Sequence, residues 1–206
     1  MNQKNNTNNE KKPGMIKRLW QWLRRPSGMA LGTLLLVGFV AGFIFVVGFN
    51  TSMTAMNSDE FCLSCHEMRD NVYQEYIETA HFSNRSGFKV GCSDCHVPHE
   101  FVPKMIRKIQ ASKELYGKVL GIIDTPQKFN EHRLAMAQNE WKRMKASNSQ
   151  ECRNCHNMNN MDFSVQKSVA AQMHREAIDL GKTCIDCHKG IAHKLPDMSG
   201  IPGAFN

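Results

Sequence analysis

The sequence predicts a mostly α-helical fold with many loops, in which one N-terminal membrane helix precedes one small domain. Two patterns support this class. Residues 28–49 form an uncharged apolar run, and the eight cysteines all lie in four copies of one motif, Cys-x-x-Cys-His. The rest of the chain has little apolar material, since aromatic residues make up 8% of 206 residues and the mean hydropathy is -0.45. Such a domain needs another source of apolar bulk for its core.

The run at 28–49, GMALGTLLLVGFVAGFIFVVGF, is long enough to cross a bilayer as a helix. Its 22 residues, at about 1.5 Å rise per residue, span the roughly 30 Å hydrocarbon layer. The alternative is a cleaved signal peptide, but such peptides have apolar regions of about 7 to 15 residues and a small-residue cleavage site, which is missing here. We therefore expect an uncleaved, single-pass anchor.

Charge is distributed unevenly about this run. Residues 1–27 carry +6 of the formal net charge of +7, and the chain after them carries only +1. Because Lys and Arg are enriched on the cytoplasmic side of membrane helices, residues 1–27 are predicted to lie in the cytoplasm and 50–206 in the periplasm. The same distribution argues against a nucleic-acid partner, since the domain itself has almost no basic excess.

The four cysteine motifs each end in a histidine. They are Cys62, Cys65 and His66; Cys92, Cys95 and His96; Cys152, Cys155 and His156; and Cys184, Cys187 and His188. Cysteines in an exported protein also suit disulfides, zinc sites or thiol redox chemistry. The histidine after every pair favours covalent attachment of a c-type haem, with the imidazole on the iron. The sequence thus predicts four covalently bound c-type haems, which also supply the missing apolar bulk.

The spacing of the motifs indicates a duplicated two-haem module. The first cysteines lie 30, 60 and 32 residues apart, and Cys-His-Glu-Met68 is matched by Cys-His-Asn-Met158. We expect modules at 58–100 and 148–198, joined by a helical connector at 101–147. The connector is predicted to contain two helices separated by a turn from Gly121 to Thr125, with Thr125 as N-cap of the second. The first is predicted to cover the haems with its apolar side while its charges are solvated.

Five histidines lie outside the motifs and are candidates for distal iron ligands. His81 and His174 occupy equivalent places in the two modules, and we expect both to ligate iron. His99 and His193 follow their motifs too closely to reach the opposite face of the same haem, so each would serve another haem or none. His132 lies outside the repeat and is expected to be structural. Whether Met68 and Met158 are ligands or packing is left open.

A membrane-anchored electron carrier needs an electron source, and quinol is the lipid-soluble candidate. Quinol oxidation releases protons as well as electrons, so a proton-accepting group is needed at the site. Lys104 and Lys108, in the first connector helix, are the candidates for this quinol site.

Several longer segments carry a resemblance: CLSCHEM, CSDCHVPHEFVPKMIRK, ASKELYGK, IDTPQKF, SQECRNCHN and CIDCHKGIAHKLPDM. With the anchor, they resemble the NapC/NirT family of membrane-bound tetrahaem quinol dehydrogenases, most closely its nitrate-reductase branch. The resemblance implies oxidation of menaquinol or ubiquinol and transfer of electrons to the dihaem cytochrome and molybdenum subunit of periplasmic nitrate reductase. Alternatives are a general quinol-oxidising electron hub, or a donor to nitrite or trimethylamine N-oxide reductase. An oligomer is left open.

The resemblance also implies iron ligands. In a related family member, the methionine of Cys-x-x-Cys-His-x-Met ligates the first haem, which implies Met68 as ligand and leaves His66 free. The proximal ligands of the other haems are then His96, His156 and His188.

The resemblance implies different kinds of distal ligand for the different haems. The second haem would receive Lys108, with His99 as a rival. His81 would serve the fourth haem and His174 the third, and the role of His193 stays open.

Two other classes of function also compete. One is a terminal reductase whose first haem reduces a small oxyanion directly, which is disfavoured because that haem follows the anchor so closely. The other is a docking subunit that transfers no charge, against which four haem motifs argue.

Overall fold

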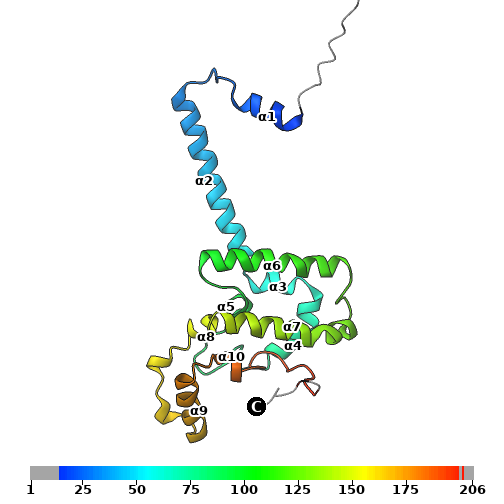
Figure 1. Cartoon of the computed structure of the whole chain (residues 1–206), viewed down its shortest axis with the longest axis vertical. Coiled ribbons are helices and arrows are strands. Elements are labelled where there is room, and N and C mark those ends of the chain that lie inside the picture. The colour runs from blue at the N-terminus through cyan, green and yellow to red at the C-terminus, as the bar shows by residue number, and fades with distance from the viewer. Residues whose placement is uncertain (1–13, 200, 202–206) are drawn as a thin grey trace, which may run out of the picture. The chain divides into compact units, whose positions relative to one another are not determined.

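The computed structural model describes residues 14–199 and 201, and in this part of the chain every regular element is helical (Figure 1). This confirms the predicted fold class. Residues 1–13, the first half of the predicted cytoplasmic segment, lie outside the described residues. The chain divides into two compact units, residues 1–50 and residues 51–206.

The first unit contains α1 (Met15–Leu23) and most of α2 (Leu31–Ala55). Helix α2 has 25 residues and a mean hydropathy of 2.5, none of it buried, so it is long and apolar enough to cross a membrane. It is apolar on all sides, as a lipid-facing helix is. Helix α2 begins three residues after the start of the predicted run and ends six residues after the end of that run. Helix α1, which the sequence reading did not predict, carries Trp20, over whose ring the Arg24 guanidinium lies at 5.3 Å.

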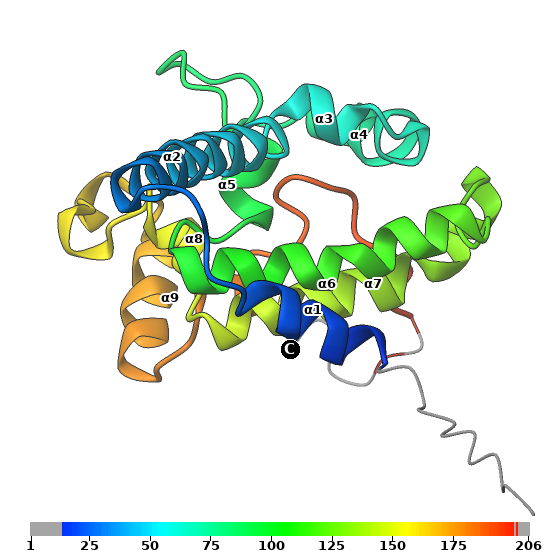
Figure 2. The same ribbon diagram turned by 90° about the horizontal axis from the view of Figure 1, so that it is seen from above.

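The second unit combines one long helical hairpin with short helices and turns. The hairpin is α6 (Phe101–Val119) and α7 (Pro126–Ala146), as Figures 1 and 2 show. The short α-helices are α3 (Asp59–Leu63), α4 (Tyr73–Tyr76), α5 (Cys92–His96), α8 (Gln150–Arg153), α9 (Ser168–Asp179) and α10 (Cys184–Cys187). A π-helical turn spans Met68–Val72, and 3-10 turns span Met158–Asn160 and Phe163–Val165.

The hairpin confirms the two-helix connector and its predicted turn. Gly121 adopts a φ of 64°, the left-handed conformation that ends helices and that glycine adopts without steric cost. The Thr125 hydroxyl accepts a hydrogen bond from the Lys128 N–H at 3.3 Å, and Pro126 occupies the first helical position.

Few apolar side chains are buried by the chain itself. Among the described residues there are six, namely Tyr76, Phe129, Met144, Ala171, Ile185 and Met198. A domain of this length normally buries many more. The polypeptide therefore surrounds no ordinary hydrophobic core, which fits a fold that wraps large apolar prosthetic groups.

The prediction that the charges of the first connector helix are solvated is wrong for two of its lysines. Ile106 and Ile109 of α6 are exposed. Two of its lysines bind the domain instead: Lys108 donates to the Met56 carbonyl at 3.1 Å, and Lys118 lies 3.5 Å from the buried Glu67 carboxylate. The helical period of the sequence is correct, but these charges face the domain and these apolar residues face away from it.

Candidate haem centre

Each Cys-x-x-Cys-His motif lies on or beside a short helix. Helices α3, α5, α8 and α10 carry Cys62, Cys92, Cys152 and Cys184 respectively. All eight cysteines are in the described part of the chain, and all are free thiols. No group of three or more His, Cys, Asp or Glu among the described residues is arranged to hold a metal ion. Among the described residues, the motifs thus form neither a disulfide nor a cluster of the zinc type.

The two predicted modules share one way of holding the helix that carries their second motif. Asp59 and Ser149 each stand three residues before the first cysteine of a module. The Asp59 Oδ1 accepts from the Cys92 N–H at 2.9 Å, and the Ser149 hydroxyl accepts from the Ile185 N–H at 3.1 Å. In both modules, a side chain before the first motif therefore caps the helix that carries the second.

The second motifs also share an internal cap. Asp94 accepts from the Gly91 N–H at 2.7 Å, and Asp186 accepts from the Thr183 N–H at 2.9 Å. Each aspartate precedes the second cysteine of its motif, so the Cys-x-Asp-Cys sequence itself fixes the helical turn.

Three pairs of histidines face one another. The ring centroids of His81 and His156 are 6.2 Å apart, those of His96 and His193 are 6.1 Å apart, and those of His174 and His188 are 5.7 Å apart. Each pair joins one motif histidine to one histidine from outside the motifs.

These separations fit a haem iron between the two rings. Imidazole–metal bonds are about 2 Å long, as at zinc sites, and a ring nitrogen lies about 1 Å from its ring centre, so two axial imidazoles have centroids roughly 6 Å apart. In the pair His174 and His188 the two Nε2 atoms face each other at 3.4 Å. The three pairs therefore suit axial ligation, with small adjustment at the last.

The other ring nitrogen of three of these histidines is held by a neighbour. The Nδ1 of His193 lies 3.2 Å from the Val72 carbonyl, and that of His174 lies 2.7 Å from the Gln166 side-chain oxygen. The Nδ1 of His96 lies 3.0 Å from the Glu140 carboxylate. Such contacts fix the ring and direct Nε2 toward a metal, as in well-ordered metal sites.

The pairing differs from the one implied by the resemblance. His81 was expected opposite the fourth motif and His174 opposite the third, whereas the structure places His81 beside His156 and His174 beside His188. The ring facing His96 is that of His193. The two residues expected for that position bind elsewhere.

Those two residues are His99 and Lys108. The His99 ring nitrogen lies 3.4 Å from the Asn154 amide, and the Lys108 ammonium binds the Met56 carbonyl. The geometry thus favours His193 over both of them as the partner of His96.

The first motif has a different environment. Met68 begins the π-helical turn, a rare element that is frequent at functional sites. His66 lies 3.4 Å from the buried Glu67 carboxylate. Met158, at the equivalent place in the second module, borders a cavity of about 310 Å³ beside His156, lined also by Gln150, Arg153, Asn157 and Asn159.

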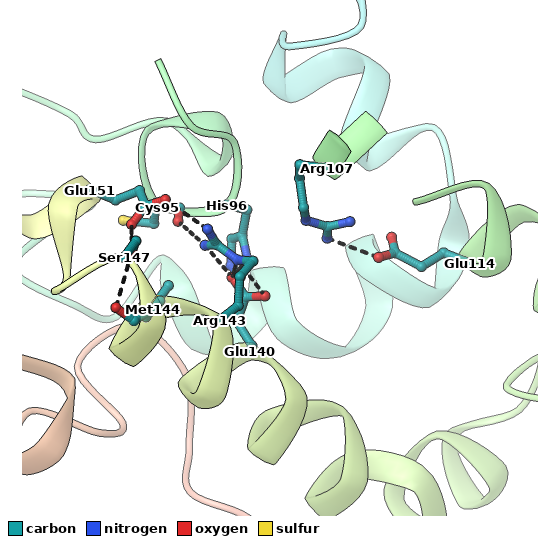
Figure 3. Close-up of polar contacts among 9 residues, drawn as sticks. All are labelled: Cys95, His96, Arg107, Glu114, Glu140, Arg143, Met144, Ser147 and Glu151. Carbon is teal, nitrogen blue, oxygen red and sulfur yellow. Dashed lines mark hydrogen bonds and ion pairs between the residues drawn. The ribbon is translucent and has the colours of Figure 1, made fainter. Parts of the chain in front are cut away.

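Arg143 of α7 links the second and third motifs (Figure 3). It donates to the Cys95 carbonyl at 2.9 Å and to Glu151, which directly precedes Cys152, at 2.7 Å. It also binds Glu140, the partner of His96. Burial favours the protonated form of Glu140, but the hydrogen bonds from His96 and Arg143 outweigh it and lower the pKa of Glu140 to about 2.

Neither Glu140 nor Arg143 was predicted from the sequence to be a site residue. Their only signal is the spacing of an acid and a base three residues apart on a predicted helix, which is common on exposed helices.

Burial shapes the protonation of the candidate ligands and of the lysines. Burial lowers the pKa values of His81 and His193, and the neighbouring His156 and His96 respectively add to this effect. Both therefore favour the neutral imidazole that binds metals. Burial also lowers the pKa of Lys108, helped by the positive charges of Arg107 and Lys104.

Free Cys-x-x-Cys-His thiols and facing histidines, behind a helix able to cross a membrane, define a membrane-anchored c-type cytochrome that transfers electrons. The family model described as NapC/NirT cytochrome c family, N-terminal region, matches residues 24–198, so the chain belongs to that family.

Relatives of known name agree with this family. The cytochrome c-type protein NapC of Escherichia coli is 67% identical over 198 residues, covering 96% of this chain and 99% of the relative. NapC of Haemophilus influenzae is 56% identical over 196 residues, covering 95% and 97%. The denitrification system component NirT of Stutzerimonas stutzeri is 52% identical over 191 residues, covering 92% and 93%.

Proposed function

We propose that this protein oxidises quinol at the periplasmic face of the cytoplasmic membrane and passes the electrons to periplasmic nitrate reductase. The observation that carries the proposal is the set of four haem-attachment motifs in a domain that directly follows a helix able to cross the membrane. The NapC relatives and the segments shared with the nitrate-reductase branch favour nitrate reductase, with its dihaem and molybdenum subunits, as acceptor. The N-terminus would lie in the cytoplasm.

Four c-type haems would be bound, each through the two cysteines of one motif. The first haem would be held by Met68, and the other three by the pairs His96 with His193, His156 with His81, and His188 with His174. When bound, the haems supply one-electron carriers whose potentials depend on their axial ligands.

The side chains around these ligands hold them in place. Val72, Glu140 and Gln166 each bind the Nδ1 of one ligating histidine, which fixes the ring and its tautomer. A thioether from Met68 would give the first haem a higher potential than imidazole would. A high potential at that position favours uptake of electrons from quinol.

In this assignment, each proposed module supplies one iron ligand to a haem motif of the other module. His193 of the second module would serve the second motif, and His81 of the first module would serve the third motif. Neither module then holds a complete ligand set alone. The shared caps from Asp59 and Ser149 support the origin of both by duplication.

Lys108 and Lys104 are proposed to take part in proton uptake from quinol. Lys108 is the stronger candidate because burial lowers its pKa, which raises the share of neutral amine able to accept a proton. Lys108 donates a hydrogen bond to the carbonyl of Met56, which is the residue directly after the end of α2.

The test is reduction of the full-length holoprotein in phospholipid nanodiscs by menaquinol or ubiquinol, followed through the haem absorption bands. Nitrate reductase with nitrate should then reoxidise the haems. Absence of reduction by either quinol would contradict quinol oxidation and favour a docking role. Reoxidation by nitrite or trimethylamine N-oxide reductase at an equal rate would favour the general electron hub.

A further inference from the structure

One side of α6 is a largely apolar stripe, interrupted by Lys113, that points away from the domain. It contains residues spaced by four, three, seven and four positions, which places them on one face of a helix. Their exposed fractions lie between 51% and 72%, and they are Val102, Ile106, Ile109, Tyr116 and Leu120, the last at the C-cap. Such a stripe in a soluble protein normally faces the core.

The opposite side of α6 is charged and meets the domain. Lys108 and Lys118 reach inward to the Met56 carbonyl and the Glu67 carboxylate. The Arg107 side chain is only 16% exposed and pairs with Glu114. These contacts identify the inner face of α6, so the apolar stripe is not the surface by which the helix packs on its own domain.

The hydrogen bond from Lys108 to Met56 also shows which part of the chain α6 contacts. Met56 directly follows Ala55, the last residue of α2, which is the helix able to cross a membrane. The middle of α6 is therefore bound to a residue seven positions beyond the apolar run 28–49, which is about 10 Å of helical rise past the hydrocarbon layer and close to the lipid headgroups if α2 is the anchor.

We propose that α6 lies in the outer interfacial layer of the bilayer, with the stripe from Val102 to Leu120 in contact with lipid acyl chains. An amphipathic helix with a charged face binds a membrane surface in this way. Lys113 lies within the stripe, and its long stem can extend along the apolar surface while its ammonium reaches the headgroups. The proposal extends the proposed function, since Lys108 would then receive quinol directly from the lipid.

Photo-cross-linking of the full-length holoprotein in phospholipid nanodiscs tests this placement. The photoreactive residue p-benzoylphenylalanine is placed at Ile109, and the matched control carries it at Asn139, an exposed position on α7. We expect lipid adducts at position 109, detected by peptide mass, at least about tenfold above those at position 139. Equal adducts at both positions, none at 109, or adducts at 109 to a second copy of the chain would overturn the proposal.

A second experiment tests the consequence for function. In Ile106→Glu with Ile109→Glu, oxidation of a long-chain quinol held in the membrane should fall about tenfold, while oxidation of a short-chain, water-soluble quinol stays within about twofold. Unchanged haem absorption shows that the variant is folded. An equal fall with both quinols would contradict lipid access along α6. If the unaltered protein oxidised neither quinol, the proposed function would fail, whereas the lipid adducts at position 109 would still decide the placement.

Discussion

The Nδ1 of His96 lies 3.0 Å from the Oε1 of Glu140, so a residue of the connector helix α7 holds the histidine of the second haem motif (Figure 3). Arg143, one turn further along, donates to the same carboxylate oxygen at 2.7 Å. A carboxylate partner orients a metal-bound imidazole and makes it more basic. The connector therefore does more than join the two modules, because it sets the environment of a proposed iron ligand.

Replacing this carboxylate should change a haem potential. In Glu140→Gln, the His96 ring loses a negatively charged partner and becomes a weaker donor, so the oxidised iron is less well stabilised. We expect one haem potential to rise by about 30 to 60 mV, a factor of roughly three to ten in the one-electron equilibrium. Spectroelectrochemical titration of the holoprotein measures this, with Glu131→Gln on the same helix as control. Four unchanged potentials would show that Glu140 does not act on a ligand.

The partner of His96 can be identified by substitution. In His193→Ala, one low-spin haem should become high-spin, since the geometry places no other imidazole opposite His96 among the described ring contacts. In His99→Ala, the spin states should stay as they are. Electron paramagnetic resonance of the oxidised protein distinguishes the two, and the reverse result would restore His99 as the ligand.

Arg143 should be important for stability. Its removal in Arg143→Met leaves Glu140 and the buried Glu151 without their main cation, and loss of one partner of a buried ion pair costs about 3 kcal/mol or more. Arg143→Lys should recover only part of this, because one ammonium cannot make the same set of directed hydrogen bonds. Denaturant unfolding of the holoprotein, followed by Soret circular dichroism, measures both. A loss below about 0.5 kcal/mol in Arg143→Met would mean that the network is not stabilising.

Features encoded locally were predictable from the sequence. The cap at Thr125, the turn at Gly121 and the apolar helix depend on residues within one or two turns of each other. The haem motifs are also local. Their chemistry requires two thiols and an imidazole at fixed spacing, so four haem-attachment sites could be predicted without any tertiary contact.

Features that depend on tertiary arrangement could not be derived from spacing. The partners of His156 and His188 lie far apart in sequence in one case and close in the other, so spacing gives no rule for the pairing. Lys108 and Lys118 of α6 were also predicted to be solvated, whereas they contact the domain. A helical hydrophobic period fixes which residues share a face, but whether that face meets protein or lipid depends on what surrounds the helix.

The ion pair of Glu75 with Arg133 predicts how stability responds to acid. Their side chains are 14% and 15% exposed, the Arg133 guanidinium donates to Glu75 at 2.8 Å, and the Lys194 N–H donates at 2.9 Å. Burial favours the protonated carboxyl, but the hydrogen bonds from Arg133 and Lys194 outweigh it and lower the pKa of Glu75 from its ordinary value. The folded protein thus binds this proton less readily than the unfolded chain does. The pair stabilises the fold fully above the unfolded pKa, and this contribution is lost as the pH falls through the folded value.

Glu75→Gln should therefore be less stable than the unaltered protein at pH 7, by about 2 kcal/mol for a charged hydrogen bond. The difference should shrink as the pH falls below the ordinary pKa of a glutamate, about 4.3, because the unfolded chain then binds a proton that the folded protein still lacks. Denaturant unfolding of both holoproteins between pH 7 and 3 measures it, with the double variant Glu75→Gln and Arg133→Met as a check on the unpaired guanidinium. A difference that stays constant down to pH 3 would show that the carboxylate charge of Glu75 contributes nothing and that only its shape is needed.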